Sequence, residues 1–457
     1  MTHLHRGMGG KARSLGGFPT TTTIPFMSSD LPSYEQAAAL VAAHAHTLAQ
    51  HRPRTECIPL ANAAGRILAA PIAADDDQPP FARSTRDGYA CRAAEASAHT
   101  ALSVAGSTHA GQPPAGPLPI GKAWEIMTGA PVPAGADCVV MLEHVEKSAK
   151  TIRLLPPRTI DPGDNVVAKG AQSLRGDELL KIGTKLAPAQ IALAASCGYS
   201  TLEVFVRPRV AILTTGDELV PVDATPGPGK IRNSNAPMLA ALVATAGADP
   251  VVLPTAADTA EALDAALAQA LQADMLLISG GVSAGKFDLV EPALARLGAT
   301  FHFTGVHIQP GKPLVFGEIA GSGLRPYINR ARSEETSGPA SIPLFGLPGN
   351  PISSAATFHL FAAPILAALA GSLETHPRFV LAHLSRDTDR KTKSGLTRFL
   401  PAHCEFNPSV TKIPQVALVP WQGSGDLTAF AHSNCFLVIP EDAGFLTAGT
   451  TVRILLH

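Results

Sequence analysis

The amino-acid sequence predicts an α/β multidomain protein built around a parallel sheet that is covered by helices. The chain has 457 residues, about three times the roughly 150 residues of one domain, so several separate cores are expected. From residue 208 onward strand-like and helix-like runs alternate, and such βα units form parallel sheets. Two other stretches, 72–158 and 379–456, hold short β-type runs between turn residues, which predicts two smaller β-rich parts.

The first part of the chain predicts helices on either side of a β-rich insertion. Alanine and leucine spacing predicts helices at 33–51 and 60–70. A third helix is expected at 188–197, where Gly198 supplies the usual glycine cap. Residues 1–30 have no apolar core of a secretory signal and are expected to be a leader.

The later elements follow from the same patterns. In the central part, strands are expected at 210–214, 251–254, 275–279, 314–316 and 343–347, and helices at 237–247, 260–271 and 288–297. C-terminal strands are expected at 379–384, 397–402, 415–419, 435–439 and 451–456, which suits a small barrel or sandwich. The domains are then a disordered leader (1–30), a helical elongated domain (31–71 and 165–206), a β-rich inserted domain (72–164), an α/β domain (207–372) and a C-terminal β-barrel domain (373–457).

Composition excludes several classes of protein. Hydrophobic residues make up 46% and charged residues 16% of the chain, unlike a disordered chain. The net charge of −1 argues against a nucleic-acid-binding surface. Six scattered cysteines without a CxxC pair predict free thiols in a reducing cytoplasm. The apolar run 355–371 contains His359 and Pro364 and is expected to be a buried helix, not a membrane span.

Three loops at the carboxyl ends of predicted strands carry unusual residues, and ligands of open α/β sheets bind at such ends. The loop at 214–219 contains Thr215, Gly216 and two carboxylates, although a turn with a solvated acid pair explains it equally well. The loop at 279–288 is glycine-rich and leads into a helix, which predicts a backbone cradle for an anion. The loop at 346–351 is made rigid by two prolines and suits a ligand clamp or a tight turn.

One alternative for the glycine-rich loop is a hydrolase. Residues 281–285 formally match the G-x-S-x-G nucleophile elbow. Ser283 follows two further glycines after the strand, and no downstream Asp/His pair is evident by spacing, so we discount this alternative. Basic residues near the loops include Lys230 and Lys312, each of which by itself is more often a solvated surface charge.

Together these loops predict a site for a phosphorylated ligand and a divalent cation. Glu218 and Asp288, with Asp258 as a further candidate, offer oxygen ligands, which Mg²⁺ prefers. The histidines show no i, i+4 pair and no HExxH, so no metal role is assigned to them.

Read jointly, the motifs resemble the molybdopterin molybdenumtransferase family, that is, the MoeA proteins and the E domain of gephyrin. The resemblance covers nearly the whole chain from about residue 31. It rests on the loops above and on two further motifs, PFARSTRDGYA at 80–90 and IMTGAPVPAGAD at 126–137. It implies an L-shaped homodimer with a helical elongated subdomain, a β-rich subdomain, a molybdopterin-binding α/β subdomain and a C-terminal β-barrel.

The resemblance also implies a reaction in molybdenum cofactor biosynthesis. Adenylylated molybdopterin binds, molybdate is inserted into its dithiolene, and the pyrophosphate link is hydrolysed with Mg²⁺ to release AMP. The cleft would lie between the α/β domain of one subunit and the β-rich domain of its partner. Further expected partners are a molybdopterin adenylyltransferase and molybdoenzymes or their chaperones, with neither nucleic acid nor membrane.

Site residues are carried over by motif position. Asp87 and Thr128 would reach across from the partner subunit, and Glu218 and Asp288 would hold metal or orient the ligand. Lys312 is the candidate for a fixed positive charge between the anions and the carboxylates. The expected ligand-binding residues are Thr215, Gly216, Asn235, Ser279, Gly280, Gly281, Ser283, Gly285, Pro348, Gly349, Asn350 and Pro351.

The sequence departs from the family pattern at a few positions. Arg86 stands where the motif usually has Met, Gln172 where an acidic residue is expected, and Gln309 where some members have Lys. The stretch 321–339 looks like an insertion. The alternatives are a molybdopterin adenylyltransferase, whose related α/β domain carries a similar loop, and a catalytically weakened binding or scaffold protein of the same fold.

Overall fold

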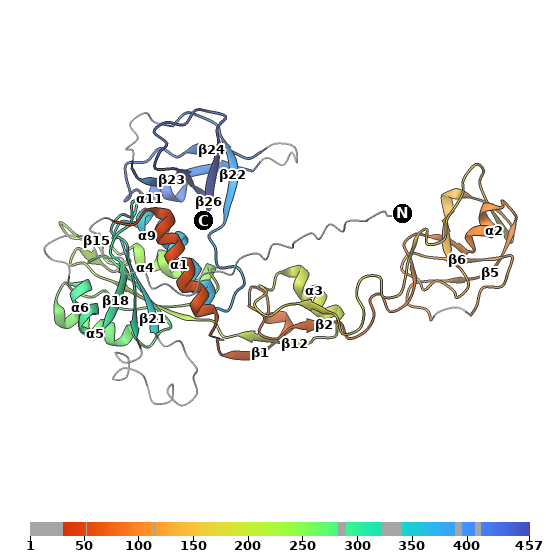
Figure 1. Ribbon diagram of the computed structural model, residues 1–457, viewed down its shortest axis with the longest axis horizontal. Helices are drawn as coiled ribbons and strands as arrows, with labels where there is room; N and C mark the ends of the chain where they lie inside the picture. The colour runs from red at the N-terminus through yellow and green to blue at the C-terminus, as the bar shows by residue number, and fades with distance from the viewer. Residues whose placement is uncertain are drawn as a thin grey trace, which may run out of the picture.

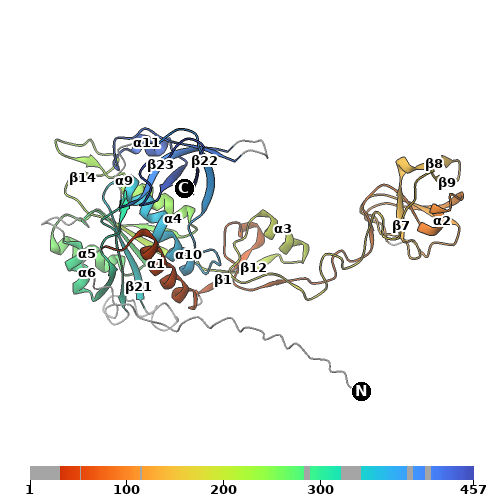
Figure 2. The same ribbon diagram turned by 45° about the horizontal axis from the view of Figure 1, so that its top comes forward.

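A computed structural model describes residues 31–51, 53–113, 116–281, 289–320, 341–388, 395–406 and 413–457. The expected leader and the 321–339 stretch lie outside the described residues. The chain is elongated (Figure 1). An α/β body and a β-barrel lie at one end, a narrow middle part follows, and a β-rich part lies at the far end, as the turned view also shows (Figure 2).

The α/β body is built on a six-stranded sheet in the order β16-β13-β17-β21-β20-β18. Its elements are α1 (Tyr34–Ala49), β13 (Arg209–Thr214), β14 (Leu219–Val220), β15 (Ile231–Arg232), α4 (Asn235–Thr245), β16 (Asp249–Val252), α5 (Ala260–Ala270), β17 (Met275–Ser279), α6 (Val290–Arg296), β18 (Ala299–Phe303), β20 (Val315–Ala320), β21 (Ser341–Leu347), α9 (Pro351–Thr357), the π-helical turn η3 (Phe358–Ala362) and α10 (Ala363–Leu369). The predicted strands and helices of this part are confirmed within a few residues.

Both faces of the sheet are buried because side chains alternate along each strand. Val210 and Ile212 of β13 join a core with α4, α9 and α10. Ala211 and Leu213 join the opposite core with α5 and α6. Four strands, β16, β13, β17 and β21, are parallel as predicted.

The other two strands run differently from the expected βα pattern. β20 pairs antiparallel with β21, and β18 pairs antiparallel with β20. Residues 304–314 between β18 and β20 contain no helix, and only parallel neighbours need a crossover helix. The sheet is therefore mixed at this edge.

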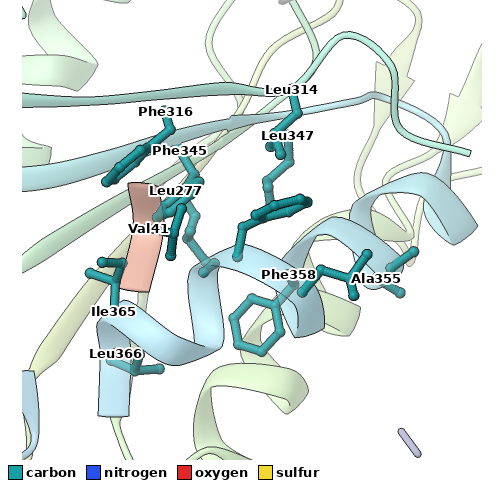
Figure 3. Close-up of a cluster of buried hydrophobic side chains, with 14 of the residues drawn as sticks. Val41, Leu277, Leu314, Phe316, Phe345, Leu347, Ala355, Phe358, Ile365 and Leu366 are labelled. Carbon is teal, nitrogen blue, oxygen red and sulfur yellow. The ribbon is translucent and has the colours of Figure 1, made fainter. Parts of the chain in front are cut away.

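The first helix, α1, lies on the α/β body and not in the middle part, so its expected place in a helical elongated domain is wrong. A capping box starts it, in which Ser33 Oγ accepts from Gln36 N and Gln36 Oε1 accepts from Ser33 N. Its buried face, which includes Val41, packs on α10 and against the sheet residues Leu277 and Phe345 (Figure 3). Burial of this apolar face decides its position.

The apolar helical run Pro351–Leu369 is long and apolar enough to cross a membrane by composition. However, 78% of that stretch is buried inside the structure. Its residues Ala355, Phe358, Ile365 and Leu366 lie in the core beside the sheet (Figure 3). The expectation of a buried core helix is confirmed.

The middle part is less helical than predicted. Its elements are β1 (Thr55–Pro59), the 3-10 turn η1 (Leu60–Asn62), β2 (Ile72–Ala73), β11 (Glu178–Leu180), α3 (Pro188–Ser196) and β12 (Thr201–Phe205). The third predicted helix is confirmed as α3, and Gly198 follows it at φ +80°. The predicted helix at 60–70 is wrong, because Ile67 and Leu68 form bridges to Lys185 and Val204 and so give this segment long-range partners.

The β-rich part at the far end contains a six-stranded sheet in the order β7-β4-β6-β5-β9-β8. Its elements are β3 (Arg83–Ser84), β4 (Gly88–Cys91), α2 (Ala93–Ser97), β5 (Leu102–Thr108), β6 (Lys122–Ile126), β7 (Cys138–Met141), the 3-10 turn η2 (Leu142–His144), β8 (Val145–Ser148), β9 (Thr151–Leu154) and β10 (Val166–Val167). Fully buried Tyr89 lies in its core.

The C-terminal part is a closed barrel, as expected. Strand β23 pairs with both β24 and β25, and this second pairing closes the sheet on itself. Its elements are β22 (Phe379–Leu384), β23 (Thr397–Glu405), β24 (Gln415–Leu418), α11 (Leu427–Ala431), β25 (Cys435–Ile439) and β26 (Thr451–Leu456). Strand β19 (Ile308–Gln309), which precedes β20 in the chain, pairs with β23 and ties the barrel to the α/β body.

Candidate functional site

Three predicted loops meet at the carboxyl edge of the parallel sheet. The last residues of β13, β17 and β21, which are Thr214, Ser279 and Leu347, stand side by side in the sheet register. Beyond them the backbone remains joined, because Thr215 N donates to Ser279 O at 3.1 Å and Gly280 N donates to Leu347 O at 3.3 Å. The three loops therefore form one surface, as the strand order predicts.

The glycines after β17 are required by this close approach. Gly280 has φ +94° and Gly281 has φ +62°, which is the region that favours glycine. A Cβ at Gly280 would lie 2.5 Å from Thr215 O, and one at Gly281 would lie 2.8 Å from Val290 Cγ2. Any larger residue would push these loops apart.

Two asparagines at the start of α4 hold the loops together. Asn235 Nδ2 donates to Ser279 Oγ at 2.8 Å and to Gly349 O at 2.6 Å. Asn233 is 7% exposed, and its Nδ2 donates to Thr214 Oγ1 at 2.8 Å. Asn233 Oδ1 accepts from the backbone of Ala236, inside the first turn of α4. One helix terminus thus positions all three loops.

Two buried polar atoms at this edge have no hydrogen-bond partner among the described residues: Thr215 Oγ1 and Asn235 Oδ1. Buried side-chain polar atoms in native proteins nearly always have one. A small hollow beside Thr215 is lined by Thr215, Ala257, Asp258, Thr259, Gly281 and Val290, among others. An unpaired hydroxyl at the hollow and an unpaired amide oxygen on α4 at the same edge favour a polar ligand here.

Three carboxylates rim the site. Asp217 and Asp258 are joined reciprocally, since each backbone N–H donates to the other carboxylate at 3.2 Å. The Glu218 carboxylate folds back over Gly216, where a Cβ would lie 2.5 Å from Glu218 Oε2. Lys230 Nζ donates to Asp217 O at 2.5 Å. The carboxylate oxygens and the Lys230 ammonium group therefore lie together at this edge of the sheet.

The proline loop after β21 also contacts the C-terminal barrel. Asn350 Nδ2 donates to Ser424 Oγ at 2.9 Å, and Ile352 N donates to Ser424 O at 3.1 Å. Pro351 takes the first position of α9, where a proline costs no hydrogen bond. The hydroxyl of Ser354 donates to Pro348 O. The Pro348–Pro351 loop is thus fixed from both sides.

The structure brings Lys312 to the same edge of the sheet. Val315, three residues later, pairs with Gly346 near the end of β21, and the Lys312 side chain is exposed. Ser283, Gly285 and Asp288 lie in 282–288, outside the described residues.

Asp87 and Thr128 lie elsewhere, in the β-rich part at the far end of the chain (Figure 2). Thr128 donates to Asp87 Oδ1 from its backbone N–H at 2.6 Å and from its hydroxyl at 2.8 Å. These bonds, the backbone one first, lower the pKa of Asp87 below its usual value. Within one chain the structure does not bring this pair to the glycine loops.

Sequence reasoning missed two positioning residues. Ser424 carries no motif signal, because its role comes from barrel packing. Asn233 belongs to no motif either, and its hydrogen bonds to Thr214 and to the backbone of Ala236 hold β13 to α4.

Comparisons with known proteins match this architecture along the chain. Family models for the MoeA N-terminal region (domain I and II), a probable molybdopterin binding domain, and the MoeA C-terminal region (domain IV) match residues 32–198, 211–368 and 386–457. These three segments contain, respectively, the Asp87 motif, the three loops and barrel strands β23 to β26.

Curated relatives and solved structures agree. The chain is 35% identical to the molybdopterin molybdenumtransferase of Nostoc sp. over 413 residues, which covers 88% of each chain. It is 34% identical to that of Bacillus subtilis over 416 residues, covering 89% of this chain and 91% of the relative. A molybdopterin biosynthesis MoeA structure from Pyrococcus horikoshii OT3 superposes with a TM-score of 0.72 at 28% identity, covering 94% of this chain and 100% of that one. The chain therefore belongs to the MoeA family of molybdopterin molybdenumtransferases.

Proposed function

We propose that this protein inserts molybdate into adenylylated molybdopterin in molybdenum cofactor biosynthesis, with Mg²⁺-dependent hydrolysis of the pyrophosphate link and release of AMP. The observation that carries the proposal is the carboxyl edge of the sheet. There the glycine loop and the unpartnered Thr215 Oγ1 lie at a small hollow. The first turn of α4, with the unpartnered Asn235 Oδ1, is bonded to the same loops through Ser279 and Gly349. Backbone N–H groups at a helix start and in glycine turns favour a phosphorylated ligand.

Each group has a physical role in this reaction. The glycine loop and Thr215 bind the phosphorylated part of the pterin, and Asn235 holds that loop to the loop containing Gly349. The Pro348–Pro351 loop shapes the pocket and is held by Ser424. Lys312 supplies positive charge where two anionic substrates meet.

The donor set fits Mg²⁺. Asp217, Glu218 and Asp258 offer oxygen ligands at the rim, which suits a hard cation that keeps several waters. Glu218, together with Asp288, would hold it. When bound, the ion neutralises charge on the pyrophosphate oxygens. The fixed Asp217–Asp258 contact keeps the neighbouring loops in place as the ligand binds.

We further propose a cytoplasmic homodimer with a shared cleft. Asp87 and Thr128 lie in the β-rich part, while the glycine loops lie in the α/β body at the other end (Figure 1). An elongated chain that separates two half-sites can unite them across a twofold interface. The product would pass to molybdoenzymes or their chaperones, and a molybdopterin adenylyltransferase would supply the substrate.

Adenylyl transfer to molybdopterin is not favoured. The family matches at 32–198 and 386–457 cover the parts outside the α/β body, and these include the Asp87 motif and the barrel that contacts Asn350.

The test is AMP release from adenylylated molybdopterin by the purified full-length protein in Mg²⁺, with and without molybdate. We expect molybdate-dependent release that is lost in Asp288→Asn and lowered in Thr215→Val. Thr300→Val, on the exposed side of β18, is the matched control and should retain wild-type release. Tight ligand binding without any release would instead indicate a binding or scaffold protein.

A further inference from the structure

Two histidines and a glutamate converge outside the substrate site. His44 lies on α1, His302 on β18 and Glu318 on β20, and one ligand atom from each lies within 4.8 Å of the others. His44 Nε2 is 3.4 Å from Glu318 Oε2, and His302 Nε2 is 3.8 Å from Glu318 Oε1. The sequence showed no histidine cluster because these residues are distant along the chain.

The spacing fits a tetrahedral metal centre. Zinc bonds to imidazole nitrogen and carboxylate oxygen are about 2.0–2.2 Å, so two ligands of a tetrahedral site lie roughly 3.4 Å apart. His44 Nε2 is 3.4 Å from Glu318 Oε2 and His302 Nε2 is 3.8 Å from Glu318 Oε1, so each nitrogen lies near that distance from one of the two carboxylate oxygens. Small rotations of the His44, His302 and Glu318 side chains would bring all three ligand atoms to tetrahedral spacing.

The histidine nitrogens are available as ligands. Among the described residues, His44 Nε2 and His302 Nε2 are buried atoms with no hydrogen-bond partner. Each of these nitrogens faces one oxygen of the Glu318 carboxylate. A single metal ion between them would give both nitrogens and the carboxylate a partner at once.

The surroundings support the ligands. Ser341 Oγ donates to Glu318 Oε2 at 2.6 Å and so orients the carboxylate, as outer partners of metal ligands do. The buried Phe316 ring lies 5.3 Å from the His44 ring and 4.9 Å from the His302 ring. This apolar wall lowers the local dielectric and strengthens attraction between a cation and the carboxylate.

The cluster is separate from the proposed Mg²⁺ site. Glu318 pairs with Pro343 near the start of β21, whereas the glycine loops follow Leu347 at its end. Four residues of strand span roughly 13 Å. Imidazole nitrogen also suits zinc and similar ions better than Mg²⁺.

We propose that His44, His302 and Glu318 bind one Zn²⁺ ion in a tetrahedral site, with water as the fourth ligand. The ion ties α1 to the edge of the sheet that carries β18 and β20. Its three ligands come from α1, β18 and β20, so the ion would join three elements that lie far apart along the chain.

The test is Zn²⁺ binding by the full-length protein after chelator treatment, in excess Mg²⁺, measured by equilibrium dialysis and metal analysis. We expect one Zn²⁺ per chain and a rise in the melting temperature. His44→Gln and Glu318→Gln should weaken binding at least tenfold, and Ser341→Ala by about 10–100-fold. His46→Gln, exposed on the same helix, and Cys57→Ser, which removes an exposed thiol, are matched controls.

Two outcomes overturn the proposal. One is a wild-type protein that takes up less than one Zn²⁺ per chain, which would leave the cluster as an ordinary histidine–glutamate contact. The other is equal binding by wild type and Glu318→Gln. If circular dichroism shows that a variant does not fold, the absorption spectrum of Co²⁺ bound to the wild-type protein tests the proposed tetrahedral site instead. Tetrahedral and octahedral Co²⁺ differ strongly in absorption intensity.

Discussion

Thr128 holds one oxygen of the Asp87 carboxylate with two hydrogen bonds, from its backbone N–H at 2.6 Å and its hydroxyl at 2.8 Å. Both residues are exposed, so the pair is a fixed, charged feature on the surface of the β-rich part. A carboxylate fixed in this way, far from the glycine loops of its own chain, suits a contribution to a neighbouring subunit.

This arrangement predicts complementation between subunits. Asp87→Asn and Glu218→Gln dimers should each be nearly inactive in AMP release. After the two variants are mixed and exchanged, half of the dimers are mixed and each has one intact cleft, so about a quarter of wild-type activity should return. Absence of any recovery, with exchange verified by mass, would place both residues in one chain's site.

Gly280→Ala should disturb the glycine loop. The added Cβ would meet Thr215 O at 2.5 Å on a backbone with φ +94°, and we expect a loss of about 1–3 kcal/mol in the free energy of unfolding. AMP release should fall more steeply, because the loop is displaced at the ligand. Gly227→Ala, which has open space around it, is the control, and urea denaturation is the measurement.

Asn235→Ala should weaken binding of the phosphorylated pterin. It removes the donors to Ser279 Oγ and Gly349 O, each worth about 1 kcal/mol, and releases the glycine loop. We expect roughly tenfold weaker binding by calorimetry with the folded state retained. Asn62→Ala, exposed in the middle part, should bind as wild type, and unchanged affinity in Asn235→Ala would remove Asn235 from the site.

Arg86→Met tests the departure from the family motif. The loop is closed by bonds between Ser84 Oγ and the backbone of Arg86, while the Arg86 side chain is exposed. The free energy of unfolding should therefore change by less than about 0.5 kcal/mol. Loss of a cation next to Asp87 should raise the KM for the anionic substrate, most clearly at low salt. A large drop in the melting temperature would mean that the side chain is structural.

Acid should destabilise the core around His359. Burial lowers its pKa from the usual 6.5 to about 4. Between these values the unfolded chain binds a proton that the native histidine does not, so this contribution to stability is complete above pH 6.5 and declines as the pH falls toward 4. The His359 contribution at pH 5 should be about 2 kcal/mol lower than at pH 7.5. Urea denaturation of His359→Gln should show a smaller loss, while exposed His403→Gln should match wild type.

Much of the fold was predictable because its signal is local. Strand and helix periods located the elements of the α/β body and the barrel, and runs of glycine and proline after strands located the three loops. Gly280 illustrates why: its positive φ and its close approach to Thr215 disfavour every other residue, so a glycine at this position is visible in the sequence.

Other features depended on partners far along the chain. Residues 60–70 have helix-like spacing but are drawn into β bridges, and β18 and β20 run antiparallel because no helix separates them. Asn233 and Ser424 act through packing, which leaves no motif.

By itself the sequence determined the element types, the site loops and the resemblance to the MoeA family, since short-range periodicity, turn chemistry and ordered motifs carry that information. Only the tertiary structure decided that α1 packs on the α/β body, that Asp87 lies away from its own chain's glycine loops, and that His44 meets His302 and Glu318. All three features depend on residues that are distant along the chain. Such contacts are selected when apolar surface is buried against a specific partner. A local sequence pattern does not encode which partner that is.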